Sequence, residues 1–334
     1  MKFATLRDGT RDGCLLLVSR DLSRAVKSDD IAPTLQRALE DWRSVEPALL
    51  ERYAALNAGT AAGAFAFEPA ACMAPLPRTH QFVDASAFLN HGQIMSRAYE
   101  LDPPPTDRSV MIQRQGDDFR GAREDYSFPD PGDQCDFEGE VAVVLDDVAQ
   151  GVSHEAALSH VRLVLLFNDV SMRGKLVQEL KLGFGFIQAK PAPAFAAVAV
   201  TPDELGDGWA DGRVNLSLHV YRNDERVGKP NGREMSFPFG RLIEQLAYNR
   251  NLTAGTVLGS GTFSNEDHAA AGSACLAEIR ALERLRYGES RTPWLAYGER
   301  LRFEMYGLDG QSVFGALEQR FVPRQQAAIR NTTA

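Results

Sequence analysis

Cysteine is scarce in this 334-residue sequence, and its four copies are far apart: Cys14, Cys72, Cys135 and Cys275. No CxxC pair occurs, so the spacing indicates neither a zinc knuckle nor a disulfide scaffold. We therefore expect four reduced, buried thiols.

Long apolar runs are also missing. No stretch approaches the roughly 20 apolar residues that a membrane span needs, and the N-terminal MKFATLRDGTRDG lacks the apolar core of a signal peptide. We expect no membrane partner and a cytoplasmic location.

A basic excess is absent as well. Lys and Arg total 36 against 45 Asp and Glu, for a formal net charge of -9 and a pI near 5.3. Phosphate backbones require a concentrated basic surface, so a nucleic-acid partner is not expected. The glycine-containing GFGFIQ at 183–188 and GSGTF at 259–263 lack the full dinucleotide spacing, which argues against a Rossmann fold.

What is present is an ordinary globular composition, 44% hydrophobic and 24% charged. Residues 1–28 read as a hairpin with strands at 1–6 and 14–19, and helical spacing from 33 to 57 predicts one amphipathic helix that would break at Pro47. The P-L-P at 75–77 suits a connection between units. We expect a small N-terminal α/β domain at 1–75, a main domain at 76–325 and a tail at 326–334.

Short β-rich runs dominate the main domain, among them VMIQR, EVAVVLD, VRLVLLFND, AFAAVAV, VNLSLHVYR and ACLAEIRAL. Helical patterns interrupt them at 87–99, 154–162 and 239–249. Strands without regular helical crossovers predict an α+β, mostly β fold.

The sharpest local pattern is DFEGE at 136–140. Residues two apart on a strand share a face, so Glu138 and Glu140 would lie about 7 Å apart and converge on one ion, with Asp136 pointing the same way. The alternative is a solvated strand face with the apolar residues of 141–145 turned inward.

Asp169 ends the apolar run at 163–167, where an unpaired charge is costly to bury. Its partner is either a cation or Arg173, four residues further on. Oxygen ligands favour Mg, Mn or Ca over zinc.

Seven residues separate Asp84 from His91 in DASAFLNH. If Asp84 begins a helix, His91 lies two turns later on about the same face. Simple capping by Asp84 and a merely packed histidine are the alternatives.

Taken in order, five motifs resemble those of the fumarylacetoacetate hydrolase family: DASAFLNH at 84–91, DFEGE at 136–140, FNDVSMR at 167–173, Lys190 in FIQAKPAPAF, and GSGTFSNED at 259–267. The resemblance covers roughly residues 78–322, and residues 1–75 resemble the small N-terminal domain of many members. It implies a mixed β-roll catalytic domain, usually dimeric.

The resemblance also implies a divalent cation, Mg first with Mn or Ca as alternatives, bound by four acids: Asp84, Glu138, Glu140 and Asp169. In hydrolytic members the histidine matching His91 takes a proton from water. A titrating imidazole suits both removal and return of that proton.

Other positions carry over by the same resemblance. Lys190 matches a lysine near the substrate oxygens, Arg173 an arginine of substrate binding or lid closure, and Thr262 a threonine that contacts a substrate carboxylate. Their alternatives are a surface lysine, an Asp169 ion pair and an ordinary tight turn.

Three departures from the hydrolase that names the family bear on whether its exact reaction carries over to this chain. Leu176 replaces a glutamine, with Gln178 displaced by two, and Ser86 replaces a tyrosine. Glu278 lies near the place of the glutamate that orients the family histidine.

We therefore expect a hydrolase that cleaves a carbon–carbon bond of a 1,3-diketo acid, of fumarylacetoacetate or acylpyruvate type. The alternatives are a 2-oxo acid decarboxylase, hydratase or isomerase acting through the same enolate, and a non-catalytic metal- or ligand-binding protein.

Overall fold

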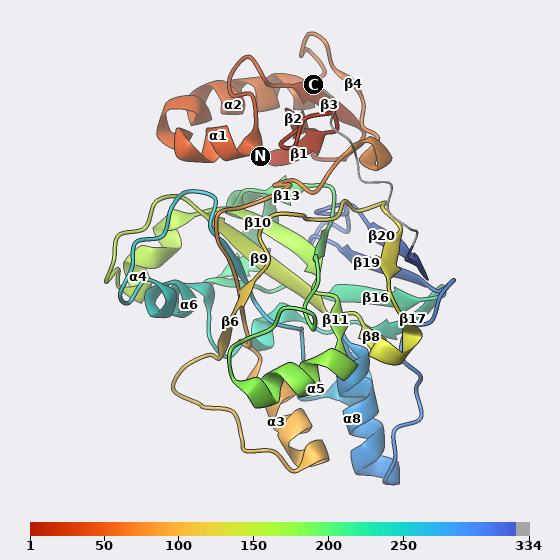
Figure 1. The fold of residues 1–334 in the computed structure, drawn as a ribbon. Coiled ribbons are helices and arrows are strands. Elements are labelled where there is room, and N and C mark those ends of the chain that lie inside the picture. Colours follow the sequence, from red (N-terminus) through yellow and green to blue (C-terminus); the bar gives the residue numbers. More distant parts are fainter. Residues whose placement is uncertain (325–334) are drawn as a thin grey trace.

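A computed structural model describes residues 1–324 (Figure 1). The tail predicted at 326–334 lies outside these residues, and the domain boundary near residue 75 stays a prediction. Within the described part, no helix combines the length and apolarity needed to cross a bilayer.

The larger sheet has eleven strands and runs from the N-terminal hairpin into the main domain. Its order is β4 (Phe65–Ala66), β3 (Arg24–Lys27), β2 (Cys14–Val18), β1 (Lys2–Leu6), β13 (Ala199–Val200), β10 (Val161–Asn168), β9 (Gly139–Leu145), β18 (Val257–Gly259), β5 (Phe82–Ala85) and β6 (Met111–Arg114), with β12 (Ala194–Phe195) also on β10. Only the β18–β5 pair in it is parallel.

A second sheet of five strands packs beside the first, in the order β17 (Glu225–Gly228), β16 (Leu218–Arg222), β19 (Arg300–Met305), β20 (Leu317–Pro323) and β7 (Tyr126–Phe128). Two short pairs complete the β-structure: β8 (Cys135–Asp136) with β11 (Ser171–Met172), and β14 (Trp209–Ala210) with β15 (Arg213–Val214). The expected mostly β α+β fold is confirmed.

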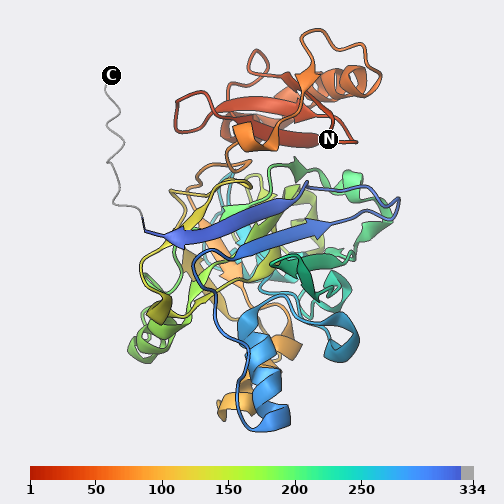
Figure 2. The same ribbon diagram turned by 90° about the vertical axis from the view of Figure 1, so that its right-hand side faces the viewer.

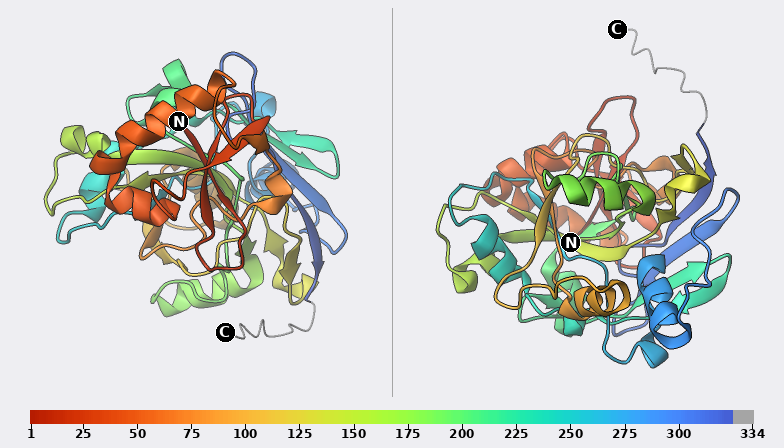
Figure 3. Two further views of the ribbon diagram at one scale, coloured as in Figure 1. Left: turned by 90° about the horizontal axis from the view of Figure 1, so that it is seen from above. Right: turned by 60° about the horizontal axis from the view of Figure 1, so that its bottom comes forward.

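Helices cover the ends of these sheets. They are α1 (Leu35–Glu40), α2 (Trp42–Asn57), α3 (Leu89–Tyr99), α4 (His154–Ala157), α5 (Arg173–Leu182), α6 (Phe239–Leu246), α7 (His268–Ala271) and α8 (Leu276–Tyr287). Figures 1 and 2 show α1 and α2 over the N-terminal strands, and α3, α5 and α8 together at the opposite end of the molecule. Seen from above, the N-terminal unit lies over the main domain (Figure 3).

Several sequence-based boundaries were wrong. The N-terminal helix breaks at Asp41, not at Pro47, which lies inside α2. The helix expected at 154–162 ends early because β10 begins at Val161. AFAAVAV forms two short strands, β12 and β13, that pair with different residues of β10, not one continuous strand.

The largest difference concerns residues 274–282. Their pattern predicts a strand, but α8 begins at Leu276. Leu276, Ala277, Glu278 and Ala281 are its buried residues, which is a helical spacing. The alternation of apolar and polar residues in so short a run did not separate the two periods.

Two large hydrophobic clusters fill the molecule, one between the sheets and one beneath α1 and α2, and a third, small cluster joins α3 to α8. All four cysteines are free and buried, as expected. The rigid strands of the larger sheet place acidic side chains at one end, next to α3, α5 and α8.

Candidate active site

Asp84 lies in β5, not at a helix start, because Phe82, Val83 and Ala85 are buried and pair with neighbouring strands. The helix that carries His91 begins only at Leu89. A Cβ added to Gly259, the β18 partner of Asp84, would lie 2.3 Å from Asp84 Oδ1, so glycine is required there. The backbone N–H of Gly261 donates to the same oxygen at 3.2 Å.

Three buried carboxylates converge at this end of the sheet: Asp84, Glu140 from β9 and Asp169 just beyond β10. One oxygen from each lies within 4.8 Å of the others. Glu140 is fully buried, and neither of its oxygens accepts a hydrogen bond from any described residue. Buried and all-oxygen, with Glu140 unpartnered, this donor set fits a hard divalent cation such as Mg²⁺, Mn²⁺ or Ca²⁺.

Burial and crowding together raise the proton affinity of Asp84 and Glu140. Burial, and then the charge of Asp169, raise the pKa of Asp84 to about 7. Burial, followed by the charges of Asp84 and Asp169, raises the pKa of Glu140 well above its usual value. Like charges held together without a counterion have this effect, and a bound cation reverses it.

Asp169 is held by two cations. Arg114, at the end of β6, donates from Nε to Asp169 Oδ1 at 3.0 Å and also pairs with it through Nη2. Lys190 Nζ donates to Asp169 Oδ2 at 2.7 Å. The alternative pairing of Asp169 with Arg173 is therefore wrong, as is the alternative of a surface position for Lys190, which is 5% exposed.

Glu138 stands beside the three converging acids and is not one of them. Its Oε1 accepts hydrogen bonds from Lys190 Nζ at 2.8 Å, Arg173 Nη2 at 2.7 Å and Ser171 Oγ at 2.8 Å. Burial would raise its pKa, but Lys190 and Arg173 outweigh that effect and hold the pKa below its usual range.

Asp136 does not join the other acids, contrary to the expectation from strand alternation. Its oxygens accept the backbone N–H groups of Leu276 at 2.7 Å and Ala277 at 3.0 Å, in the first turn of α8. Oδ2 also accepts from Arg173 Nε at 2.9 Å. The free N–H groups of a helix start attract a carboxylate, and Asp136 supplies it from β8.

His91 on α3 meets Glu278 on α8. Its Nδ1 lies 2.9 Å from Glu278 Oε2, while Oε1 of the fully buried Glu278 has no partner among the described residues. An Nδ1–H donated to this carboxylate leaves Nε2 as the free acceptor.

These side chains surround one cavity of about 220 Å³. Its lining includes Asp84, Ser86, His91, Glu138, Arg173, Lys190 and Thr262. Glu140 and Asp169 lie behind it, linked to its wall through Asp84 and Lys190. The Thr262 hydroxyl is buried without a hydrogen-bond partner among residues 1–324. All ten residues singled out from the sequence thus gather at one place.

Arg114 was missed by the sequence reasoning. It is 4% exposed, and besides Asp169 it binds the carbonyl oxygens of Lys190 at 2.6 Å and Pro191 at 3.1 Å. A signal existed, since an arginine that closes the strand VMIQR needs a partner as much as Asp169 does.

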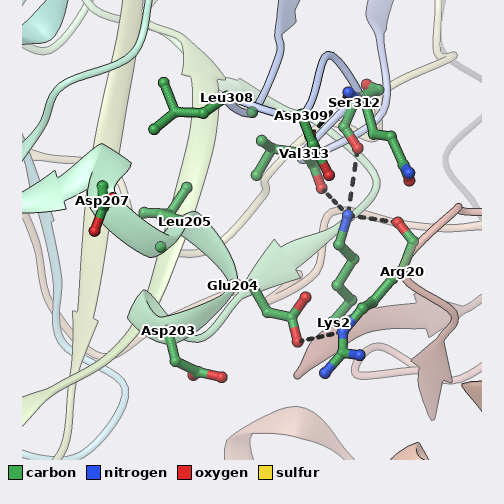
Figure 4. Close-up of a pocket in the computed structure, with 13 residues that line it drawn as sticks. Lys2, Arg20, Asp203, Glu204, Leu205, Asp207, Leu308, Asp309, Ser312 and Val313 are labelled. Atoms are coloured by element: carbon green, nitrogen blue, oxygen red, sulfur yellow. Dashed lines mark hydrogen bonds and ion pairs between the residues drawn. The ribbon is translucent and has the colours of Figure 1, made fainter.

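A larger cavity of about 470 Å³ lies elsewhere, between the N-terminal strands and the 307–313 turn (Figure 4). Its Lys2 ammonium already donates to the carbonyls of Arg20, Ser312 and Val313 at 2.9, 3.3 and 3.0 Å. Glu204 lies 3.6 Å from Arg20 Nε. The Lys2 and Arg20 cations of this cavity are therefore already partnered, although the buried Ser312 hydroxyl in its lining has no hydrogen-bond partner among residues 1–324.

Comparison with known proteins decides the family. The model of the fumarylacetoacetate hydrolase C-terminal domain matches residues 81–322, and that of fumarylacetoacetase N-terminal domain 2 matches residues 1–78. The chain belongs to the fumarylacetoacetate hydrolase family. One relative, the 2,4-didehydro-3-deoxy-L-rhamnonate hydrolase of Sphingomonas sp. strain SKA58, is 29% identical over 168 residues. That match covers 49% of this chain and 56% of the relative, so the chain spans little more than half of its length.

Solved structures share the family fold. Maleylpyruvate hydrolase from Sphingobium sp. SYK-6, in complex with manganese(II) and pyruvate, has a TM-score of 0.65 at 16% identity, covering 97% of this chain and 100% of that one. Fumarylacetoacetate hydrolase from Exiguobacterium antarcticum has a TM-score of 0.62 at 15% identity, with the same coverage.

Proposed function

We propose that this protein is a metal-dependent hydrolase that cleaves a carbon–carbon bond of a 1,3-diketo acid, of acylpyruvate or fumarylacetoacetate type. The observation that carries the proposal is that His91, paired with Glu278, lines the same cavity as Asp84 of the buried acid cluster. A base that can activate water thus stands beside a cation-binding donor set.

Asp84, Glu140 and Asp169 would hold the cation, with Glu138 beside them. When bound, a divalent cation supplies Lewis-acid polarisation of two substrate oxygens. We favour Mg²⁺, with Mn²⁺ and Ca²⁺ as alternatives, because all the available donors are carboxylate oxygens.

His91 is the proposed general base. Its Nε2 removes a proton from water, and the water oxygen attacks the C4 carbonyl carbon of the substrate. The Glu278 carboxylate fixes the imidazole through Nδ1 and stabilises the imidazolium that forms.

Cleavage follows between C3 and C4. The electron pair of that bond stays on the three-carbon fragment as an enolate, and the imidazolium returns its proton to C3. For an acylpyruvate substrate the products are one carboxylic acid from the acyl side and pyruvate from the other.

Three cavity groups are suited to bind the substrate. Lys190 Nζ keeps a third N–H besides those donated to Glu138 and Asp169, and the Thr262 hydroxyl has no other partner among the described residues. Ser86 and Arg173 line the same space. We assign the substrate carboxylate to Thr262 and an oxo oxygen to Lys190.

Loss of the 2,4-dioxo absorbance, with pyruvate measured independently, tests the proposal in EDTA-treated protein with and without Mg²⁺. Metal-dependent release of equal amounts of pyruvate and acid supports hydrolysis. No turnover with any acylpyruvate, despite cation binding, supports a non-catalytic binding protein instead.

A second enzyme function shares this cavity. Decarboxylation, hydration or isomerisation of a 2-oxo acid passes through the same enolate and needs no water activated by His91. Turnover of oxaloacetate that persists in His91→Ala while acylpyruvate hydrolysis is lost would favour this second function.

Three further expectations stay proposals. They are a homodimer, a cytoplasmic location, and the division of the chain into units at 1–75 and 76–325.

A further inference from the structure

One part of the candidate cavity is lined by apolar side chains, in contrast to the acidic side chains in the rest of its lining. Val110 and Ile112 contribute to it from the start of β6, and Leu176 and Phe186 from α5 and the segment that follows. We call these four residues the apolar wall. Leu176 follows Arg173 by three positions, so α5 presents a cation and an apolar side chain on one face.

Arg173 and Lys190 are the only Arg or Lys side chains lining this cavity in the described part of the chain. Both are already matched by acids. Arg173 binds Asp136 at 2.9 Å and Glu138 at 2.7 Å, and Lys190 binds Glu138 at 2.8 Å and Asp169 at 2.7 Å.

The side of the cavity that holds Thr262 and Lys190 and the apolar wall therefore accept different ends of a substrate. The carboxylate of the 2-oxo end finds the Thr262 hydroxyl, and the adjacent oxo oxygen finds the remaining N–H of Lys190. A second carboxylate against the apolar wall would lose its water and meet no free cation, which disfavours its binding.

We propose that the preferred substrates are 2,4-dioxo acids with a single carboxylate and an apolar acyl arm, and that Leu176 and Ile112 set this preference. The inference rests on the proposed function. In the example of 2,4-dioxoheptanoate, water and substrate give butanoate and pyruvate: C3–C4 breaks, C4 gains the water oxygen, and C3 gains a proton.

The decisive comparison uses two substrates of equal length, 2,4-dioxoheptanoate and 2,4-dioxoheptanedioate, which differ by a terminal methyl or carboxylate. We expect kcat/KM to favour the monoacid by at least about tenfold. An equal or larger value for the dioate overturns the inference.

Substitution tests the wall itself. Leu176→Arg should shift the ratio of the two kcat/KM values toward the dioate by about tenfold or more. Ile112→Arg, on the other segment, should shift it the same way if Leu176→Arg does not fold. The matched control is Val177→Arg on the same helix, at a side chain 56% exposed and absent from the cavity lining. A ratio unmoved in both wall variants, or moved equally in the control, contradicts the assignment.

A binding readout separates this inference from the proposed hydrolysis. Calorimetric titration of the metal-loaded protein with 2-oxohexanoate and 2-oxoadipate compares the same two termini without turnover. Tighter 2-oxohexanoate binding without hydrolysis of any dioxo acid means that the substrate class stands and the hydrolase proposal fails. If dioxo acids are hydrolysed but 2-oxoadipate binds more tightly than 2-oxohexanoate, the hydrolase proposal stands and the substrate-class inference fails.

Discussion

His91 Nδ1 lies 2.9 Å from Glu278 Oε2, although 187 positions separate the two residues along the chain. The contact depends on the packing of α3 against α8, where Ile94 and Ala98 meet Ala281. Arg284 adds a hydrogen bond from Nε to the carbonyl of Ala98 at 2.8 Å. The helix pair therefore fixes the histidine relative to the cavity.

His91→Ala should lower kcat for acylpyruvate hydrolysis by about 10²–10⁴-fold, because a positioned general base contributes an effect of that size. Glu278→Gln should lower it by about 10–100-fold, since the imidazole keeps its place but loses the charge that supports it. Steady-state kinetics at saturating metal measures both.

The matched control for the histidine is His268→Ala, because His268 is exposed and its Nδ1 contacts only the Glu266 carbonyl at 3.1 Å. The kcat of the His268→Ala variant should equal that of the unaltered protein. Full activity in His91→Ala would remove His91 as the base.

The crowded acids make the metal-free protein sensitive to pH. The pKa of Asp84 rises from 3.8 to about 7 on folding. As pH rises from about 4, the unfolded chain releases this proton before the folded one does, so the folded state loses stability up to about pH 7 and no further. Asp84→Asn removes this contribution and should gain stability relative to the unaltered protein between pH 5 and pH 8.

Urea denaturation of EDTA-treated protein at the two pH values measures that difference, with the exposed Asp102→Asn as the control. Added Mg²⁺ or Mn²⁺ should stabilise the unaltered protein more at pH 8 than at pH 5, because only ionised carboxylates bind the cation. Identical pH dependence in Asp84→Asn and the unaltered protein would refute the raised pKa.

Arg114→Met should cost about 3–5 kcal/mol in the free energy of unfolding, because it removes both donors from Oδ1 of the buried Asp169 and leaves that carboxylate with Lys190 as its one cation. Arg120→Met breaks a pair with Asp118 whose side chains are 39% and 55% exposed, and should cost less than about 1 kcal/mol. Chemical denaturation compares the two variants. Equal costs would mean that the Arg114 pair is no more important than a surface contact.

Asp136→Asn should weaken both contacts that this carboxylate makes, with Arg173 and with the first turn of α8. An amide offers one acceptor oxygen in place of two, so we expect a loss of roughly 1–3 kcal/mol in stability. A lower kcat should accompany it, because α8 carries Glu278. The kcat and the free energy of unfolding of Asp136→Asn are compared with those of a control variant, Asp130→Asn, whose substitution lies at an exposed turn. Unchanged kcat would show that Asp136 has no influence on the dyad.

Local patterns predicted those parts of the site that depend on one strand or one short motif. The costs of burying Asp169 and of crowding Glu140 are visible in the apolar runs around them, and both residues lie in the acid cluster. The order of the motifs added Asp84 and His91, whose local spacing predicts one shared helix, whereas Asp84 lies in β5 and His91 in α3.

Contacts between distant elements escaped the sequence reasoning. Arg114 reaches Asp169 only because β6 and the end of β10 lie on the same side of the sheet, and nothing near Arg114 in the sequence names its partner. The start of α8 was misread because its first turn is stabilised by Asp136 from another element, 140 positions away. Helix capping from outside the helix leaves no local signal.

Diffraction at the manganese absorption edge, from crystals grown with Mn²⁺, tests the central claim most directly. We predict one anomalous peak bounded by the carboxylates of Asp84, Glu140 and Asp169, with oxygen ligands at about 2.0–2.3 Å. A peak elsewhere in the molecule, or no peak at these three side chains, would contradict it.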